Sequence, residues 1–165
     1  MRYRMKQKLL SLGKDFTIQD QEGNDVYFVD GRALSFGAKY SFQDMHGQEL
    51  ASIAQKVFSF RKRYRIFREN QLAAEVTRGF SWFRKRLTVD VPGPDDYEVE
   101  GRVFGREYQF TRGGIQVAKV SRAFFTFKDS YGIEIADDED QVLILATAVV
   151  IDHICDSDKS RRYIS

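Results

Sequence analysis

Two short segments of the chain combine aromatic and basic side chains in a pattern that could bind an anionic surface. Each places aromatic residues directly before three consecutive cations: Phe58 and Phe60 before Arg61, Lys62 and Arg63, and Phe80, Trp82 and Phe83 before Arg84, Lys85 and Arg86. Trp and Phe suit the membrane–water interface, and each Lys or Arg near anionic lipid contributes about 1 kcal/mol. The six cations are therefore the candidate lipid- or anion-binding residues, with Phe60, Trp82 and Phe83 as candidate membrane-interface aromatics.

The same segments allow two other interpretations. The aromatics could close the ends of a folded core while the charges keep the strand tips soluble. Aromatic side chains also stack on bases while Arg and Lys follow phosphates, as in nucleic-acid binding. The sequence pI of about 8.6 lies below the value of roughly 9 or more that marks dedicated nucleic-acid binders, which argues against that partner.

Charge is sorted along the chain, although the formal net charge is only +2. Residues 56–86 hold ten Lys and Arg against Glu69 and Glu75, whereas residues 129–158 hold nine Asp and Glu and no Lys or Arg. One interpretation is that both segments face solvent and partly neutralise each other in the fold. The other is a basic surface for an anionic partner.

Catalytic and metal chemistry find little support in the sequence. His46 and His153 are far apart, and Cys155 has no Cys or His at zinc spacing beyond His153. Gly-x-Ser-x-Gly, P-loop and dinucleotide glycine motifs are absent. The acidic cluster Asp137–Asp140 lacks the spaced ligands and turn glycine of an EF-hand, so helix capping explains it more economically than Ca²⁺. We therefore expect no enzyme, no catalytic residue, no metal and no cofactor.

The segment after this acidic cluster predicts a buried helix. Val142–Ile151 is apolar except for Thr147, and Asp137 or Asp140 would cap the first turn. A helix that is apolar on every face must be buried all round. Continuation to about residue 154 gives a helix over 139–154, which is too short for a bilayer span of roughly 20 apolar residues. We expect His153 near its C-terminal end, where a cation complements the helix dipole. For Asp152 we expect either a hydrogen-bonded partner or exposure at the mouth of the barrel.

Almost everything before this helix predicts β-strand. Hairpins are expected over 16–29, 40–53 and 64–76, further strands at 86–91, 97–100, 107–112, 116–120 and 131–135, and weaker ones near Met5 and Ala33, about a dozen in all. An internal repeat of strand, basic residue and aromatic tip begins at Ala51, Ala74 and Ala118. Repetition of this unit predicts a sheet that curls into a closed barrel without exposed edges.

The ordered set of segments resembles a known family. Ser11–Ile18, Asp44–Gly47, Asp96–Gly101 and the stretch from Tyr131 through the apolar helix are similar to the LURP-one-related family, in its bacterial YxjI-like branch. That family is grouped with tubby C-terminal domains and phospholipid scramblases. The resemblance implies a twelve-stranded β-barrel threaded by a hydrophobic C-terminal helix. It also implies relatives that bind phosphoinositides or move phospholipids, although their ligand residues do not map onto this chain.

These observations combine into one expectation. Residues 1–155 should form a single mainly β domain, a closed antiparallel barrel around a central helix, with 156–165 as a polar, frayed tail. One cysteine excludes an intrachain disulfide and, with no signal-peptide core, favours the cytoplasm. The function hypothesis is a non-enzymatic module that contacts anionic membrane lipid peripherally. The alternative is a protein-interaction or structural module without a lipid ligand, whose partner the sequence does not name.

Overall fold

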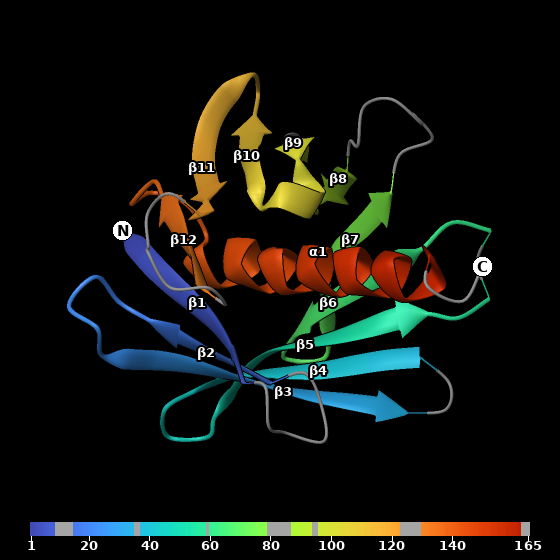
Figure 1. Cartoon of the computed structure of the whole chain (residues 1–165), viewed down its shortest axis with the longest axis horizontal. Helices are drawn as coiled ribbons and strands as arrows, with labels where there is room; N and C mark the ends of the chain where they lie inside the picture. The colour runs from blue at the N-terminus through green and yellow to red at the C-terminus, as the bar shows by residue number, and fades with distance from the viewer. Residues whose placement is uncertain are drawn as a thin grey trace.

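The chain folds into a closed antiparallel β-barrel that encloses one helix, α1 (Gln141–Arg162) (Figure 1). The computed structural model describes residues 1–8, 15–34, 37–58, 60–78, 87–93, 96–122 and 130–162. The strands are β1 (Arg2–Lys8), β2 (Asp15–Gln19), β3 (Asp25–Leu34), β4 (Gly37–Asp44), β5 (Glu49–Lys56), β6 (Arg63–Arg68), β7 (Gln71–Arg78), β8 (Leu87–Asp90), β9 (Tyr97–Arg102), β10 (Glu107–Arg112), β11 (Ile115–Ser121) and β12 (Ser130–Ile135). A short 3₁₀ turn, η1 (Val103–Gly105), joins β9 to β10. The predicted fold class is confirmed.

Strand order follows the sequence around the barrel, and β1 pairs with β12 to close it. The three predicted hairpins are β2–β3, β4–β5 and β6–β7. The weak strand expected near Met5 is β1, whereas Ala33 lies at the end of the long β3 rather than in a strand of its own. Burial alternates along the strands, as with Tyr64 and Ile66 inside β6, because successive side chains point to opposite faces.

A β-bulge near the start of the second strand recurs in four hairpins. The register shifts leave one extra residue each in β3, β5, β7 and β11, at Val26, Leu50, Ala73 and Val117. In the last three hairpins the residue that follows the bulge is the alanine that opens the sequence repeat, and all three alanines are buried. Bulges bend and twist strands at barrel rims. The repeat therefore marks the positions where the sheet curls, and its small inward side chains leave room for α1.

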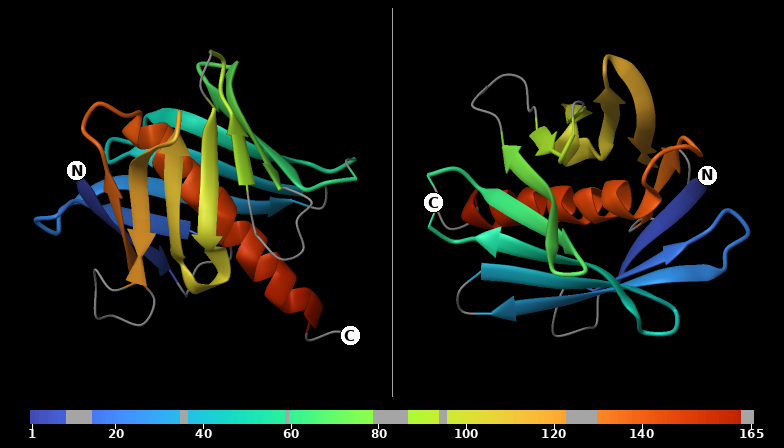
Figure 2. Two further views of the ribbon diagram at one scale, coloured as in Figure 1. Left: turned by 90° about the horizontal axis from the view of Figure 1, so that it is seen from above. Right: turned by 180° about the vertical axis from the view of Figure 1, so that it is seen from behind.

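Helix α1 runs through the barrel interior, as the views from above and behind show (Figure 2). Every residue from Leu143 to Asp152 is buried, which confirms the helix predicted to be apolar on all faces. Asp140 is the N-cap, since its Oδ1 accepts the Leu143 backbone N–H at 3.0 Å. Thr147 donates its hydroxyl to the Leu143 carbonyl at 2.8 Å, so its polar group is satisfied within the helix.

The end of α1 corrects two expectations. The helix continues to Arg162, past the predicted end near residue 154, so the first residues of the expected tail are helical. Its last turns extend beyond the strands (Figure 2), where no apolar contact is needed to hold the backbone. His153 consequently lies within the helix rather than at its end, and the proposed dipole role for it is wrong. Among the described residues, no helix has the length and apolar content to cross a bilayer.

Ion pairs fasten α1 to the barrel wall at its start and at its midpoint. At the start of the helix, Arg68 on β6 forms a two-pronged pair with Asp140, at 2.6 and 2.9 Å. At the middle of the helix, Arg106 contacts the buried Asp152 at 2.6 Å, which supplies the partner expected for that carboxylate. These pairs fix both the depth and the rotation of the helix in the barrel.

Candidate functional site

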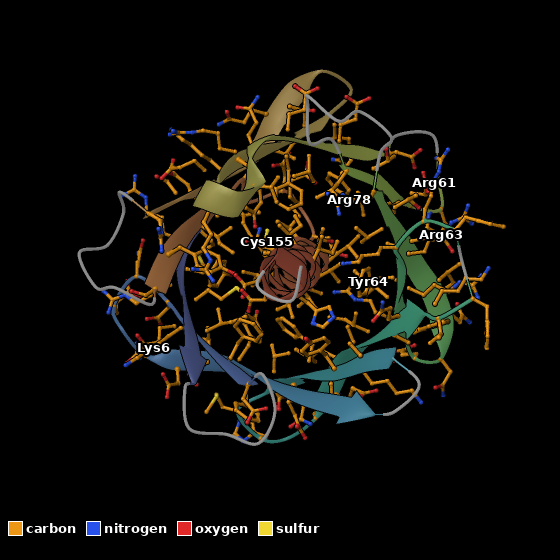
Figure 3. All side chains as sticks on the ribbon, turned by 45° about the vertical axis from the view of Figure 1, so that its right-hand side comes forward. Lys6, Arg61, Arg63, Tyr64, Arg78 and Cys155 are labelled. Carbon is orange, nitrogen blue, oxygen red and sulfur yellow. The ribbon has the colours of Figure 1, made fainter. Side chains whose placement is uncertain are left out.

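The antiparallel order gives the barrel two chemically different ends. The C-terminal ends of the odd-numbered strands and the N-terminal ends of the even-numbered strands lie at one end of the barrel, together with the C-terminus of α1, and the other strand ends lie at the opposite end. The first end, which we call the basic end, carries cations that include Lys6, Lys56, Arg61, Lys62, Arg63 and Arg78. Figure 3 labels four of them, Lys6, Arg61, Arg63 and Arg78. The second, the acidic end, carries Asp20, Glu22, Asp25, Asp44, Glu69, Asp96, Asp137 and Asp138. The barrel is thus polarised along its axis.

Ion pairs engage some of the oppositely charged residues within each end. At the acidic end three arginines are matched with carboxylates: Arg2 with Glu134, Arg68 with Asp140 and Arg112 with Glu139. At the basic end Glu107 accepts hydrogen bonds from the Ser121 hydroxyl and the Arg122 backbone N–H, each at 2.9 Å. A pair within one end neutralises one charge of each sign and leaves the net charge of that end unchanged. The difference in sign between the two ends therefore rests on the two sets of residues named above.

Among the described residues of the basic end, the β5–β6 tip, residues 56–58 and 60–63, is the most exposed apolar feature. Phe58 and Phe60 are 94% and 113% exposed, and Val57 is 47% exposed. Exposed apolar side chains that are grouped together can mark an interaction surface. The backbone below the tip is anchored, because the Arg78 N–H donates to the Lys62 carbonyl at 3.4 Å across to β7. The sheet therefore holds two phenyl rings beyond its end.

Three of the six predicted cations lie on this tip. Arg61 is exposed, whereas Lys62 and Arg63 are half-buried. Arg63 shares Glu75 with Arg65, at 3.4 and 3.0 Å, so part of its charge is compensated by β7. The exposure of Phe60 does not support the interpretation in which it closes the barrel. The predicted residues Trp82, Phe83, Arg84, Lys85 and Arg86 lie outside the described residues, in the connection between β7 and β8.

Ion pairs between the basic segment 56–86 and the acidic segment 129–158 neutralise only part of the charge of the two segments. Arg68 and Asp140 join the basic segment 56–86 to the acidic segment 129–158. The pairs made by Arg63 and Arg65 stay inside the basic segment, and Arg106 and Arg112 come from neither segment. The sorted charges of the sequence thus appear in space mainly as the two ends of the barrel.

A polar cluster lies inside the basic end, beside the last buried turns of α1. The Tyr40 hydroxyl and His153 Nδ1 are 2.7 Å apart, and the Tyr64 ring packs edge-on against the same imidazole at 5.7 Å between centroids. Burial raises the pKa of the Tyr40 hydroxyl above its usual value of 10.0. Cys155 is buried, with its Sγ 3.6 Å from the Val103 carbonyl. Tyr40, Tyr64 and Cys155 are buried and His153 is half-buried, and together these groups connect α1 to the wall.

The acidic cluster Asp137–Asp140 serves structure. Asp137 accepts the N-terminal ammonium of Met1 at 2.7 Å, and Asp140 caps α1. Glu139, with its side chain 2% exposed, contacts Arg112 at 2.7 Å and accepts the Tyr97 hydroxyl at 2.6 Å. Burial, followed by the bond to Glu139, raises the pKa of Tyr97. In the described ranges no three His, Cys, Asp or Glu side chains gather in the arrangement of a metal site.

Sequence reasoning missed several of these features. Phe58 was part of the motif, but only the geometry shows that its ring points to solvent. Arg106, which adopts a left-handed backbone with φ of 55° and stacks over the Tyr131 ring at 5.0 Å, gave no sequence signal. The Tyr40–His153 contact joins residues 113 positions apart. Such pairs depend on strand register and on the rotation of α1.

Comparison with known proteins identifies relatives of nearly the whole chain. A family model described as LOR, LURP-one-related, matches residues 1–152. The uncharacterized protein YxjI of Bacillus subtilis (strain 168) is 30% identical over 155 residues, covering 94% of each chain. The X-ray structure of a protein from Arabidopsis thaliana has a TM-score of 0.69 at 19% identity, covering 93% of this chain and 91% of that one. The plant protein shares the fold, and the bacterial relative is named without a function.

Proposed function

The chain belongs to the LURP-one-related family, and from that premise we propose that it is a non-enzymatic binding module whose basic end rests on an anionic membrane surface. The observation that carries the proposal is the β5–β6 tip, where Phe58 and Phe60 stand almost fully exposed directly before Arg61, Lys62 and Arg63. Exposed aromatic rings suit the interfacial layer, and cations suit the phosphates above it. The neighbouring β7–β8 connection repeats the same sequence pattern.

The expected strength is that of reversible, peripheral association. Arg61 and Lys62 would contribute about 2 kcal/mol at an anionic surface, and Arg63 would contribute less than about 1 kcal/mol because Glu75 compensates part of its charge. Each phenyl ring would add at most roughly 1.5–3 kcal/mol if its exposed area were fully buried. The electrostatic attraction between the cations and the lipid decays within a Debye length of about 10 Å at 0.1 M salt. Binding should therefore need anionic lipid and weaken with ionic strength.

Orientation follows from the polarity of the barrel. With the basic end on the membrane, the acidic end points away from the like-charged lipid headgroups. The axis of α1 then lies near the membrane normal, with its C-terminus at the surface. An opposite orientation would set carboxylates such as Asp20 and Asp44 against anionic phosphates.

Vesicle flotation tests the proposal. The wild-type chain should float with phosphatidylcholine vesicles that contain about 30% phosphatidylserine and stay behind with pure phosphatidylcholine, since charge supplies the attraction. Neutralising the tip with Arg61→Gln, Lys62→Gln and Arg63→Gln should weaken binding about 30- to 100-fold, because about 2–3 kcal/mol is lost and 1.4 kcal/mol is tenfold.

The matched control changes the net charge equally at the other end. Gln21→Glu, Gln48→Glu and Gln71→Glu alter exposed side chains of the acidic end and also lower the net charge by three. Equal weakening by both triple variants would reduce the effect to overall charge and contradict a docking surface. A wild-type chain that does not bind vesicles but shifts a single-stranded oligonucleotide would favour nucleic-acid binding. Capture of a stable protein partner without vesicle binding would favour a protein-interaction module.

A further inference from the structure

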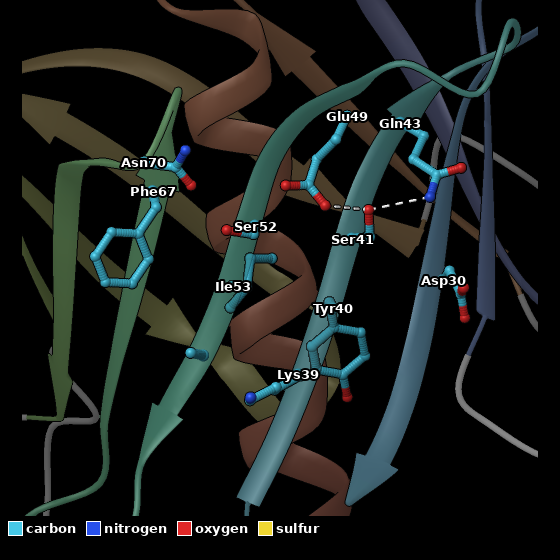
Figure 4. Close-up of a pocket in the computed structure, with 11 residues that line it drawn as sticks. Asp30, Lys39, Tyr40, Ser41, Gln43, Glu49, Ser52, Ile53, Phe67 and Asn70 are labelled. Carbon is cyan, nitrogen blue, oxygen red and sulfur yellow. Dashed lines mark hydrogen bonds between the residues drawn. The ribbon is translucent and has the colours of Figure 1, made fainter.

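We propose that the outer wall of the barrel carries a second site, for a small neutral ligand rich in hydroxyl groups, of the size of a mono- or disaccharide. A groove of about 560 Å³ lies on the outside of β3, β4, β5 and β6 (Figure 4). This volume lies in the range of roughly 300–1,000 Å³ that small-molecule sites occupy. The site is on the barrel wall rather than at the basic end, so it goes beyond the membrane proposal.

Strand register builds the groove from one row of outward-facing residues. Asp30 pairs with Ser41, Ser41 with Ser52, and Ser52 with Phe67, on four adjacent strands. Their chain neighbours Tyr40 and Ile53 are buried, so this row faces outward. The two middle strands carry only serine hydroxymethyl groups in this row, whereas β6 carries a phenyl ring. The outer wall is therefore recessed over β4 and β5, between Phe67 on β6 and Asp30 on β3.

The polar groups of the groove are already ordered. Ser41 donates its hydroxyl to Glu49 Oε2 at 2.5 Å and accepts the Gln43 Nε2–H at 3.0 Å. This network fixes a carboxylate and an amide at one side of the groove, facing the ring and the amide of Asn70 at the other (Figure 4). Preordering matters because a ligand then loses less free energy in organising its partners.

This combination selects the ligand class. A hydroxyl group both donates and accepts, and the groove presents acceptors on Glu49 beside amides that do both on Gln43 and Asn70. Phe67 offers a half-buried ring to the apolar face of a sugar. Lys39 and Asp30 bring charges of opposite sign to the same groove, which gives no dominant attraction for an ion.

Two other occupants fit less well. A phosphate would meet the Glu49 carboxylate where the polar groups converge, and like charges repel. An extended peptide could not add itself as a strand, because β3, β4, β5 and β6 are each hydrogen-bonded on both sides in the closed barrel. A neutral polyhydroxylated ligand avoids both costs.

Amide NMR titration of the full chain tests the site with glucose, maltose and inorganic phosphate as probes. We expect saturable shifts from a sugar at the amides of Ser41, Ser52 and Phe67. Phe67→Ala should weaken sugar binding at least tenfold, and Ser52→Tyr, which fills the groove without removing Phe67 or Glu49, should abolish it. Ile115→Ala, at a side chain 71% exposed on β11, is the matched control and should bind as the wild type does.

Each outcome bears on the assignment. Saturable sugar shifts that Phe67→Ala weakens and Ser52→Tyr abolishes, with no shifts caused by phosphate, support the assignment. Absence of sugar shifts, sugar binding unchanged by Ser52→Tyr, or shifts of the same amides by phosphate would overturn it. Vesicle binding by the basic end is measured separately, and it should persist in Ser52→Tyr.

Discussion

Replacing Leu145 by Asp should prevent the barrel from folding. The side chain is 0% exposed and lies in the part of α1 that strands surround on every side. Leu145→Ala, which only removes buried methyl groups, should lower the free energy of unfolding by about 3–5 kcal/mol. Leu145→Asp loses the same packing and adds several kcal/mol for burying a carboxylate. The sum approaches the whole stability of a domain this size, about 5–15 kcal/mol.

Urea unfolding followed by far-ultraviolet circular dichroism gives the measurement. Leu145→Ala should show a cooperative transition at lower urea with an unchanged slope, and Leu145→Asp should show no native baseline. Ile115→Asp is the control, since that side chain is 71% exposed and the same kind of change there should stay within about 0.5 kcal/mol. A folded Leu145→Asp protein with the wild-type midpoint would refute the role of α1 as the core.

Three further predictions concern the polar groups that hold the helix and its surroundings. Asp140→Ala should cost about 1–2 kcal/mol in urea unfolding, through loss of the cap; Asp140→Asn keeps the cap acceptor, so an equal cost for both would assign the effect to the Arg68 pair instead. Arg106→Met should lower the free energy of unfolding by about 3–5 kcal/mol because it leaves Asp152 buried without this partner. Adding Asp152→Leu should restore most of the lost stability. An unchanged urea midpoint for Arg106→Met would contradict a stabilising role of the Arg106–Asp152 pair. Burial raises the pKa of Tyr3 from 10.0 to about 12. The unfolded chain therefore loses the Tyr3 proton at lower pH than the folded chain, and the free energy of unfolding should fall as pH rises from 10 to about 12. Tyr3→Phe should flatten part of this fall, and a wild-type free energy of unfolding that stays level over this range would contradict the prediction.

The fold was accessible from sequence because several independent local signals agree. The acidic residues before Val142 cap a helix, and the apolar run after them requires burial on all faces. Alternating strands and turn residues supply the wall, and the repeat that begins at Ala51, Ala74 and Ala118 predicts its closure. The structure adds that these alanines follow bulges, which no single segment reveals because a bulge is a property of a strand pair.

The errors have a common physical origin. The apolar pattern stops near residue 154 and therefore predicts the end of α1 there, but a helix that projects past the strands needs no apolar face to continue. The same pattern predicts His153 at the helix end, whereas His153 lies within α1 and contacts Tyr40. Hydrophobic periodicity indicates which residues are buried. It therefore locates the end of a helix only where burial stops at the same residue as the helix.

The candidate site was only partly predictable. The pattern of aromatics before Arg61–Arg63 is a sequence feature, but the exposure of Phe58 and Phe60 depends on the length of the tip beyond the last paired residues of β5 and β6. The division into a basic and an acidic end follows from antiparallel topology, since alternate connections share an end. The groove at Phe67 and Ser52 depends on register across four strands, which sequence patterns do not supply.

The central claim is that the β5–β6 tip enters an anionic membrane interface while the acidic end stays in water. An environment-sensitive fluorophore on Phe60→Cys, in a Cys155→Ala background, tests it most directly against the same label on Gln21→Cys at the acidic end. Phosphatidylserine-containing vesicles should shift the emission to the blue at position 60 and leave position 21 unchanged, and pure phosphatidylcholine should shift neither. A blue shift at position 21, or vesicle binding without a shift at position 60, would contradict the proposed surface.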